Sequence, residues 1–178
     1  MPRPKPVYDV VKYETYHPDS WFTVKYNDTQ DANSIQVNVQ ILNTETLNLY
    51  FGDGTNPSDM VSFSAPNNGV FDRFGNSASA ITDTTQNWLN VTTTPLNSSY
   101  TEFYASRFVN SSDTSGRDTS IPCNTTTSYF WQLLPSNTNG TWDLIMDENC
   151  HPLITEPVAE HATKLILGAT ALITLSLL

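Results

Sequence analysis

Residues 35–41 read Ile-Gln-Val-Asn-Val-Gln-Ile, with an apolar side chain at every second position and an amide side chain between each pair. Successive side chains of a β-strand point to opposite faces, so a period of two predicts a strand with one buried and one polar face. After a turn that begins at Asn43, Leu47, Leu49 and Phe51 repeat the alternation. Because segments with a helical period are almost absent from the chain, this stretch predicts an all-β protein.

Further short alternating segments lie on both sides of this stretch, separated by turns rich in Asn, Pro, Ser and Gly. One of these turns, Asn67-Asn68-Gly69, is expected to use its glycine for a positive φ. About nine to ten strands of this length are typical of an antiparallel β-sandwich. The expected strands span residues 21–26, 35–41, 47–51, 61–63, 70–71, 88–93, 100–108, 127–134 and 141–146. The apolar positions of the last two are expected to pack in the core, among them Trp131, Leu133, Trp142, Leu144 and Met146.

The chain carries few charges, and most of them are negative. Among 178 residues, Lys and Arg number 8 and Asp and Glu number 18, which gives a formal net charge of −10. A nucleic-acid binder needs a basic surface to displace counterions from phosphates, and docking on anionic lipid also needs basic side chains. We therefore expect no nucleic-acid partner, and no membrane contact except through the C-terminal tail described below.

The two cysteines, Cys123 and Cys150, lie 27 residues apart in the sequence. A disulfide between them would stabilise the folded protein by about 3–4 kcal/mol in the chain-entropy model, because it restricts the unfolded chain. The alternative is a pair of buried thiols. We favour the disulfide because other features indicate an exported protein, in which disulfides persist.

The chain contains six N-x-[ST] sequons, the acceptor motif of N-glycosylation. Most fall at expected loops or strand edges, where a glycan can be accommodated. Together with the cysteines, they predict an extracellular or cell-surface glycoprotein. The acceptor residues are Asn27, Asn90, Asn97, Asn110, Asn124 and Asn139.

The two ends of the chain differ in character. Residues 1–14 begin as a Pro-rich extended arm with no apolar stretch typical of a signal peptide. Residues 154–164 form a polar spacer, and residues 165–178 form an uncharged apolar tail. The tail is shorter than the ~20 residues that span a bilayer. Three interpretations remain open: a GPI-attachment signal, a tail anchor, or a strand that is packed in the core or donated to a neighbouring subunit in an assembly.

Residues 50–134 contain a series of short landmarks in a fixed order. They are Ser58-Asp59, Asp72-Arg73-Phe74, Asp83-Thr-Thr-Gln86, Arg107, Asp113, Asp118 and Tyr129-Phe130-Trp131. In this order they resemble the DOMON domain, the module at the N-terminus of dopamine beta-monooxygenase and in extracellular b-type cytochromes. The resemblance implies an immunoglobulin-like β-sandwich over residues 15–153. It also implies a role in haem binding, in sugar binding, or in interaction beside a catalytic domain.

The cytochrome members of the DOMON family hold haem iron between a Met and a His. Thr55 and Asn56 stand where the family places its Met, a few residues before the Ser-Asp landmark. Met60 and His151 are therefore the remaining haem-ligand candidates, and we expect no haem at them.

The acidic landmarks have a second use, because carboxylates are ligands that Ca²⁺ prefers. Asp59, Asp113 and Asp118 are the candidates for such a metal site. The competing interpretation is structural: Arg107 pairs with one of these carboxylates across the end of the sheet and fixes the loop from Asn110 to Ile121.

The sequence contains no nucleophile elbow, zinc-protease motif or phosphate-binding loop, so we expect no enzyme. The predicted function is that of a non-enzymatic extracellular binding or structural module with a protein or glycan partner, tethered to a surface or assembled through its ends. The alternatives are a haem electron carrier and a sugar-binding module. For the latter, the tryptophans would report binding: Trp21, Trp88, Trp131 and Trp142.

Overall fold

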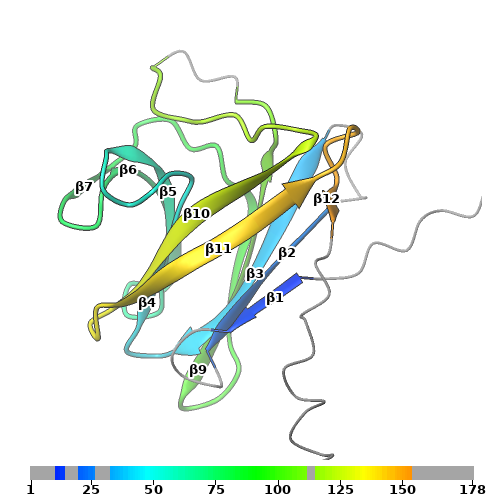
Figure 1. Cartoon of the computed structure of the whole chain (residues 1–178). Coiled ribbons are helices and arrows are strands. Elements are labelled where there is room, and N and C mark those ends of the chain that lie inside the picture. The colour runs from blue at the N-terminus through cyan, green and yellow to red at the C-terminus, as the bar shows by residue number, and fades with distance from the viewer. Residues whose placement is uncertain (1–10, 15–19, 27–32, 112–114, 154–178) are drawn as a thin grey trace, which may run out of the picture.

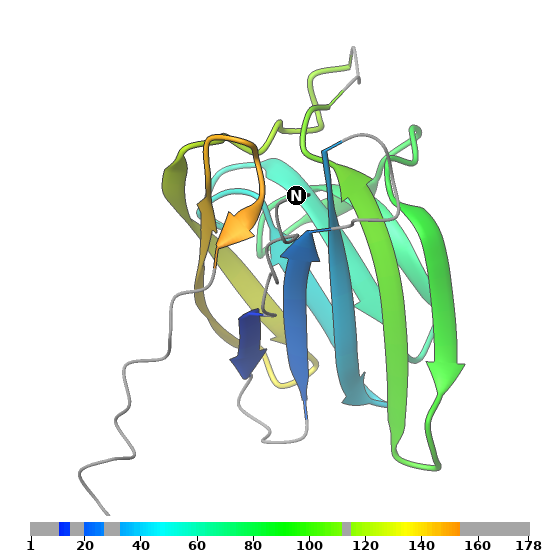
Figure 2. The ribbon, with the colours of Figure 1, turned by 90° about the vertical axis from the view of Figure 1, so that its right-hand side faces the viewer.

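The computed structural model describes residues 11–14, 20–26, 33–111 and 115–153, which fold into two antiparallel sheets packed face to face (Figures 1 and 2). This confirms the predicted all-β sandwich. The five-stranded sheet contains, in spatial order, β1 (Val11–Glu14), β2 (Trp21–Tyr26), β3 (Ser34–Leu42), β9 (Tyr100–Phe108) and β8 (Leu89–Pro95). The seven-stranded sheet contains β12 (Pro152–Leu153), β11 (Thr138–Met146), β10 (Thr125–Leu134), β4 (Thr46–Tyr50), β5 (Ser58–Ser64), β6 (Gly69–Gly75) and β7 (Ala80–Thr82).

Strand β3 is the centre of the five-stranded sheet and carries the alternation from which the fold was predicted. The four apolar side chains of this alternation, Ile35, Val37, Val39 and Ile41, are completely buried between the sheets. Each such side chain contributes about 1.5–3 kcal/mol through the surface it removes from water. β3 pairs with β2 on one side and with β9 on the other.

Aromatic side chains join the two sheets. Phe22 on β2 packs edge-on against Trp142 on β11, with 5.6 Å between ring centroids, and Phe63 on β5 meets Phe103 on β9 at 6.0 Å. Such pairs add about 0.5–1.5 kcal/mol beyond their buried area. The five core residues predicted from the last two long strands, including Trp131 and Trp142, are all buried.

Three short strands and one turn differ from expectation. β1, β7 and β12 have only two to four residues each and exist because a neighbouring strand supplies hydrogen-bond partners. Since β1 lies within residues 1–14, the sandwich begins before the expected boundary at residue 15. In the turn before β6, Asn68 takes the positive φ of 50°, whereas Gly69 is the first residue of the strand. Asn adopts this left-handed conformation more readily than other non-glycine residues.

Two loops cover the outer face of the seven-stranded sheet around β4, β5 and β10. Ser77 donates a backbone hydrogen bond to the Gly54 carbonyl, and its own carbonyl accepts one from the side chain of Gln132 at 3.4 Å. Gly54 has a φ of 75°, and a Cβ at this position would lie 2.3 Å from the Phe130 ring. The absence of a side chain at Gly54 therefore lets the loop lie directly on the sheet.

The remaining predictions about the chain ends lie outside the described residues: the arm over residues 1–10, the spacer from residue 154 and the apolar tail. Among the residues that the structure describes, no helix has the length and apolar character needed to cross a membrane.

Candidate functional site

One ion pair joins the two sheets inside the sandwich. Asp59 lies on β5 at a position that alternates with the core residues Val61 and Phe63, so its side chain points inward. Arg107 lies near the end of β9, in register with the core residue Ile35 on β3. An Nη1 atom of Arg107 is 2.5 Å from Oδ2 of Asp59, and the two side chains are only 2% and 0% exposed.

The rest of the Arg107 guanidinium is also satisfied. Its Nη2 donates a hydrogen bond to the Thr119 carbonyl at 2.7 Å, and the Thr119 amide donates one to Oδ2 of Asp59 at 3.0 Å. The guanidinium carbon lies 4.6 Å from the centre of the Phe51 ring and 5.7 Å from that of Trp88. Arg107 thus holds the loop between β9 and β10 against both sheets. Arg107 therefore pairs with one of the acidic landmarks and contacts the loop, as expected from the sequence.

Two more carboxylates approach the same pair. Asp59, Asp72 and Asp118 each offer a carboxylate oxygen, and the three oxygens lie within 4.8 Å of one another. Asp72 lies on β6 and is completely buried, whereas Asp118 comes from the β9–β10 loop and is half-buried. The cluster therefore gathers one residue from each of two adjacent strands and one from a loop 46 positions away in the sequence from Asp72.

The pKa of Asp72 is raised to about 7, mainly by burial and also by the neighbouring carboxylates of Asp118 and Asp59. Two groups act in the opposite direction: the Asn87 amide, which donates a hydrogen bond to Oδ2 of Asp72 at 2.8 Å, and the Arg107 guanidinium. The direction of the shift shows that desolvation and like charge outweigh both favourable contacts.

Both completely buried carboxylates have one oxygen that lacks a hydrogen-bond partner. In Asp59, Oδ2 accepts hydrogen bonds from Arg107 and Thr119 while Oδ1 has none. In Asp72, Oδ2 accepts one from Asn87 while Oδ1 has none. Buried polar atoms are nearly always paired in native proteins, so two orphaned oxygens in one cluster need a physical explanation.

The surroundings do not neutralise the cluster. Asp83 is buried next to Asp72, whose carbonyl accepts a hydrogen bond from the Asp83 amide at 2.9 Å. The side chain of Arg117 approaches Asp83, with 3.8 Å between Nη1 and Oδ1. Counted formally, four carboxylates and the guanidiniums of Arg107 and Arg117 leave two negative charges at this end of the sandwich.

Of the three metal candidates named from sequence, the structure brings Asp59 and Asp118 together, and Asp113 lies outside the described residues. Sequence reasoning missed Asp72 as a member of the cluster. The sequence does contain a signal for Asp72. By the period of two in residues 70–74, Asp72 shares the inward face of the strand with Val70 and Phe74. A carboxylate on the core side of a strand is rare unless it is paired or binds a metal.

The two haem-ligand candidates are far apart. Met60 alternates with Asp59 and Val61, so it lies on the outer face of β5, where it is completely buried. His151 directly precedes β12, and strands β4, β10 and β11 lie between the two positions. Four strand spacings of about 4.8 Å separate them by roughly 19 Å, which is much wider than one iron atom can bridge. Met60 and His151 are therefore too far apart to ligate one haem iron together.

Cys123 and Cys150 form a disulfide with a Cα–Cα distance of 4.8 Å, as predicted. The disulfide joins the residues before β10 to the turn between β11 and β12. Among the sequon asparagines that the structure describes, all are exposed: Asn90, Asn97, Asn110, Asn124 and Asn139. Asn27 lies outside the described residues.

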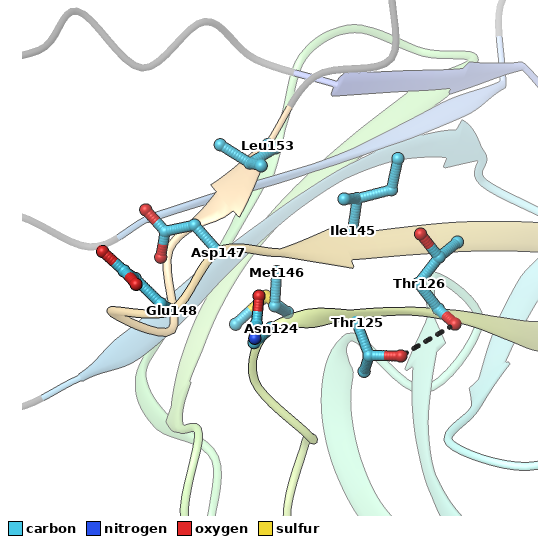
Figure 3. A pocket seen from close by; sticks show the side chains of 8 residues that line it. All are labelled: Asn124, Thr125, Thr126, Ile145, Met146, Asp147, Glu148 and Leu153. Carbon is cyan, nitrogen blue, oxygen red and sulfur yellow. Dashed lines mark hydrogen bonds between the residues drawn. The ribbon is translucent and has the colours of Figure 1, made fainter.

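A surface pocket of about 360 Å³ lies beside the disulfide, between the start of β10 and the end of β11 (Figure 3). Its lining includes Asn124, Ile145, Glu148 and Leu153. Because Asn124 is a sequon acceptor, a glycan on it would occupy the mouth of this pocket. The pocket is therefore a poor candidate for a ligand site in a glycosylated protein.

The tryptophans do not form an aromatic platform for a sugar. Trp88, Trp131 and Trp142 are buried in the core with exposed fractions of 4%, 8% and 2%. Trp21 on β2 is half-buried. A stacking surface needs exposed ring faces, so the arrangement gives no support to the sugar-binding alternative.

Comparison with models of known protein families and with curated proteins found no match for this chain. The DOMON resemblance therefore rests on the landmarks quoted above.

Proposed function

We propose that this chain is an exported, N-glycosylated, non-enzymatic β-sandwich module that acts by binding a protein partner. The observation that carries the proposal is the Cys123–Cys150 disulfide, because disulfides persist mainly in oxidising compartments outside the cytosol. The exposure of every described sequon asparagine agrees with it. The DOMON resemblance supports a role as an interaction module, since members of that family commonly act beside other domains.

The non-enzymatic part of the proposal rests on the lack of substrate access to the buried acidic groups. The most perturbed acidic group, Asp72, is completely buried together with Asp59. A general acid or base must come within hydrogen-bond reach of its substrate. A carboxyl without exposed surface suits a structural role better than a catalytic one.

Strand β8 supports the glycoprotein part of the proposal. It is an edge strand, and Leu89 and Val91 on it are exposed, as is Leu96 just beyond its end. An exposed apolar edge strand is a site of unwanted strand pairing unless something blocks it. Asn90 lies between Leu89 and Val91, at the point where the register with β9 shifts. A glycan on Asn90 would shield this edge from pairing with other sheets.

Mapping of the occupied sequons tests the export claim. The protein is recovered from its native source and treated with a peptide N-glycosidase in heavy-oxygen water, which marks each formerly glycosylated asparagine. We expect the mark on most of the exposed acceptors, with Asn67 and Asn76, which are not in sequons, as internal controls. A chain without any marked asparagine would overturn the proposal.

Two matched variants test the role of the glycan at β8. Thr92→Ala and Thr141→Ala each remove one sequon by changing an exposed strand residue, and each leaves its asparagine in place. The asparagine is kept because Asn90 has a φ of 53°, which most other residues adopt only with strain. We expect Thr92→Ala to increase self-association in light scattering and Thr141→Ala to leave it unchanged. Equal behaviour of the two variants would remove the shielding role.

A further inference from the structure

We propose that Asp59, Asp72 and Asp118 form a calcium site that clamps the β9–β10 loop onto β5 and β6. The inference does not depend on the proposed function, because it rests on the geometry of the cluster alone. Its ligand is a divalent cation, with Ca²⁺ as the expected ion.

The first argument is size. Ca²⁺ binds oxygen ligands at about 2.3–2.6 Å, so two ligands on opposite sides of the ion are about 4.6–5.2 Å apart. The three carboxylate oxygens lie within 4.8 Å of one another, which fits around such an ion. Mg²⁺ binds at about 2.0–2.1 Å and requires a tighter octahedron. Because Ca²⁺ accepts flexible coordination whereas Mg²⁺ needs a near-ideal octahedron, we expect calcium at a cluster drawn from two strands and a loop.

The second argument is the pair of orphaned oxygens. Oδ1 of Asp59 and Oδ1 of Asp72 are completely buried and accept no hydrogen bond, whereas Oδ2 of Asp59 accepts two and Oδ2 of Asp72 accepts one. A carboxylate oxygen buried without a donor costs several kcal/mol unless a proton or a cation stabilises it. A cation among the carboxylates would satisfy both oxygens at once.

The third argument is charge. Three carboxylates and the single guanidinium of Arg107 carry a formal charge of −2, which one divalent cation neutralises. A proton on Asp72 is the competing solution, and it removes only one charge. Arg107 holds Oδ2 of Asp59 and the Asn87 amide holds Oδ2 of Asp72, so Oδ1 of each of these two carboxylates is left for the ion.

The proposed ion has a structural consequence. Asp118 is adjacent to Thr119, whose backbone already bonds both Asp59 and Arg107. An ion held by Asp118 would add a third connection between this loop and the strands beneath it. We therefore expect calcium to raise the thermal stability of the protein and to protect the loop from proteolysis.

The test begins with wild-type protein stripped of metal by a chelator. Isothermal titration with CaCl₂ should give one site with a Kd of about 10⁻⁴–10⁻³ M, the range of extracellular calcium modules. The melting temperature should rise with added CaCl₂, and MgCl₂ should bind more weakly. An absence of heat and of a melting shift at about 10 mM CaCl₂ would overturn the proposal.

Variants separate this site from general attraction of cations to an acidic protein. Asp118→Asn changes a half-buried loop residue and should weaken calcium binding by at least about tenfold. Asp143→Asn is the matched control, because Asp143 is an exposed carboxylate on β11. It should bind calcium like wild type. Unchanged binding in Asp118→Asn, or equal losses in both variants, would refute the site.

Asp72→Asn removes a second proposed calcium ligand, the buried carboxylate on β6. Its circular dichroism spectrum shows whether it folds, and a folded variant should bind calcium at least about tenfold more weakly. If this variant does not fold, the wild-type titration and Asp118→Asn decide the question.

Discussion

Replacing Arg107 by methionine tests the ion pair between the two sheets. Methionine keeps an unbranched chain of similar reach that packs against Phe51 and Trp88, but it carries no charge and no donors. The change leaves Asp59 completely buried without its counter-ion and leaves the Thr119 carbonyl without its donor. It perturbs the electrostatics of the site and retains much of the packing.

Removing one partner of a buried ion pair costs about 3–5 kcal/mol, because the other charge stays buried and uncompensated. Loss of the cation–π contacts with Phe51 and Trp88 alone would cost about 1–2 kcal/mol. This cost overlaps with that of breaking the ion pair, because both come from the same guanidinium, so the two are not summed. We therefore expect the free energy of unfolding to fall by about 3–5 kcal/mol. A domain of this kind has about 5–15 kcal/mol in total, so the variant should be close to unfolding.

The assay is urea unfolding, followed by tryptophan fluorescence in the presence of a chelator so that bound metal does not mask the loss. Arg73→Met is the matched control. Arg73 lies on β6, is half-buried, and donates to the Ala80 carbonyl at 2.9 Å. It should lose about 1 kcal/mol or less. The reasoning is refuted if Arg107→Met and Arg73→Met have the same stability within about 1 kcal/mol.

Three other predictions follow from the same structure. Joint replacement of Cys123 and Cys150 by serine should lower the free energy of unfolding by about 3–4 kcal/mol in urea; a loss below about 1 kcal/mol would contradict a stabilising disulfide. In chelator, stability should fall as pH rises from about 4 to 8, because the pKa of Asp72 is raised to about 7 in the folded state and its carboxyl loses its proton over this range. The loss reaches about 4 kcal/mol at most, and a flat urea-stability profile would count against the shift. Haem added to the purified protein should give no bound Soret band, since Met60 and His151 lie on different parts of the seven-stranded sheet; a bound band would show a site elsewhere.

Much of the fold could be predicted because alternation is a local signal. The period of two in residues 35–41 indicates which side chains of β3 face the core, and the structure buries all four apolar residues of that stretch. The strands that were missed, such as β12 with two residues, are too short to show a period. They form because an adjacent edge offers hydrogen-bond partners, which sequence spacing does not reveal.

The candidate site could be predicted only in part, because it depends on how strands align across space. Asp59 and Asp118 were named from the sequence, but their distance from Asp72 depends on the pairing of β5 with β6 and on the path of the β9–β10 loop. The distance between Met60 and His151 likewise depends on the order of the strands. The strand order of the sheet separates Met60 from His151, although both fall within one domain of the sequence.

The most direct test of the account is diffraction from crystals grown with CaCl₂, with data collected at a long X-ray wavelength where calcium scatters anomalously. We predict an anomalous peak among the carboxylates of Asp59, Asp72 and Asp118, about 2.3–2.6 Å from their oxygens. The account is contradicted if no peak lies there, or if calcium binds instead at an exposed carboxylate such as Asp53.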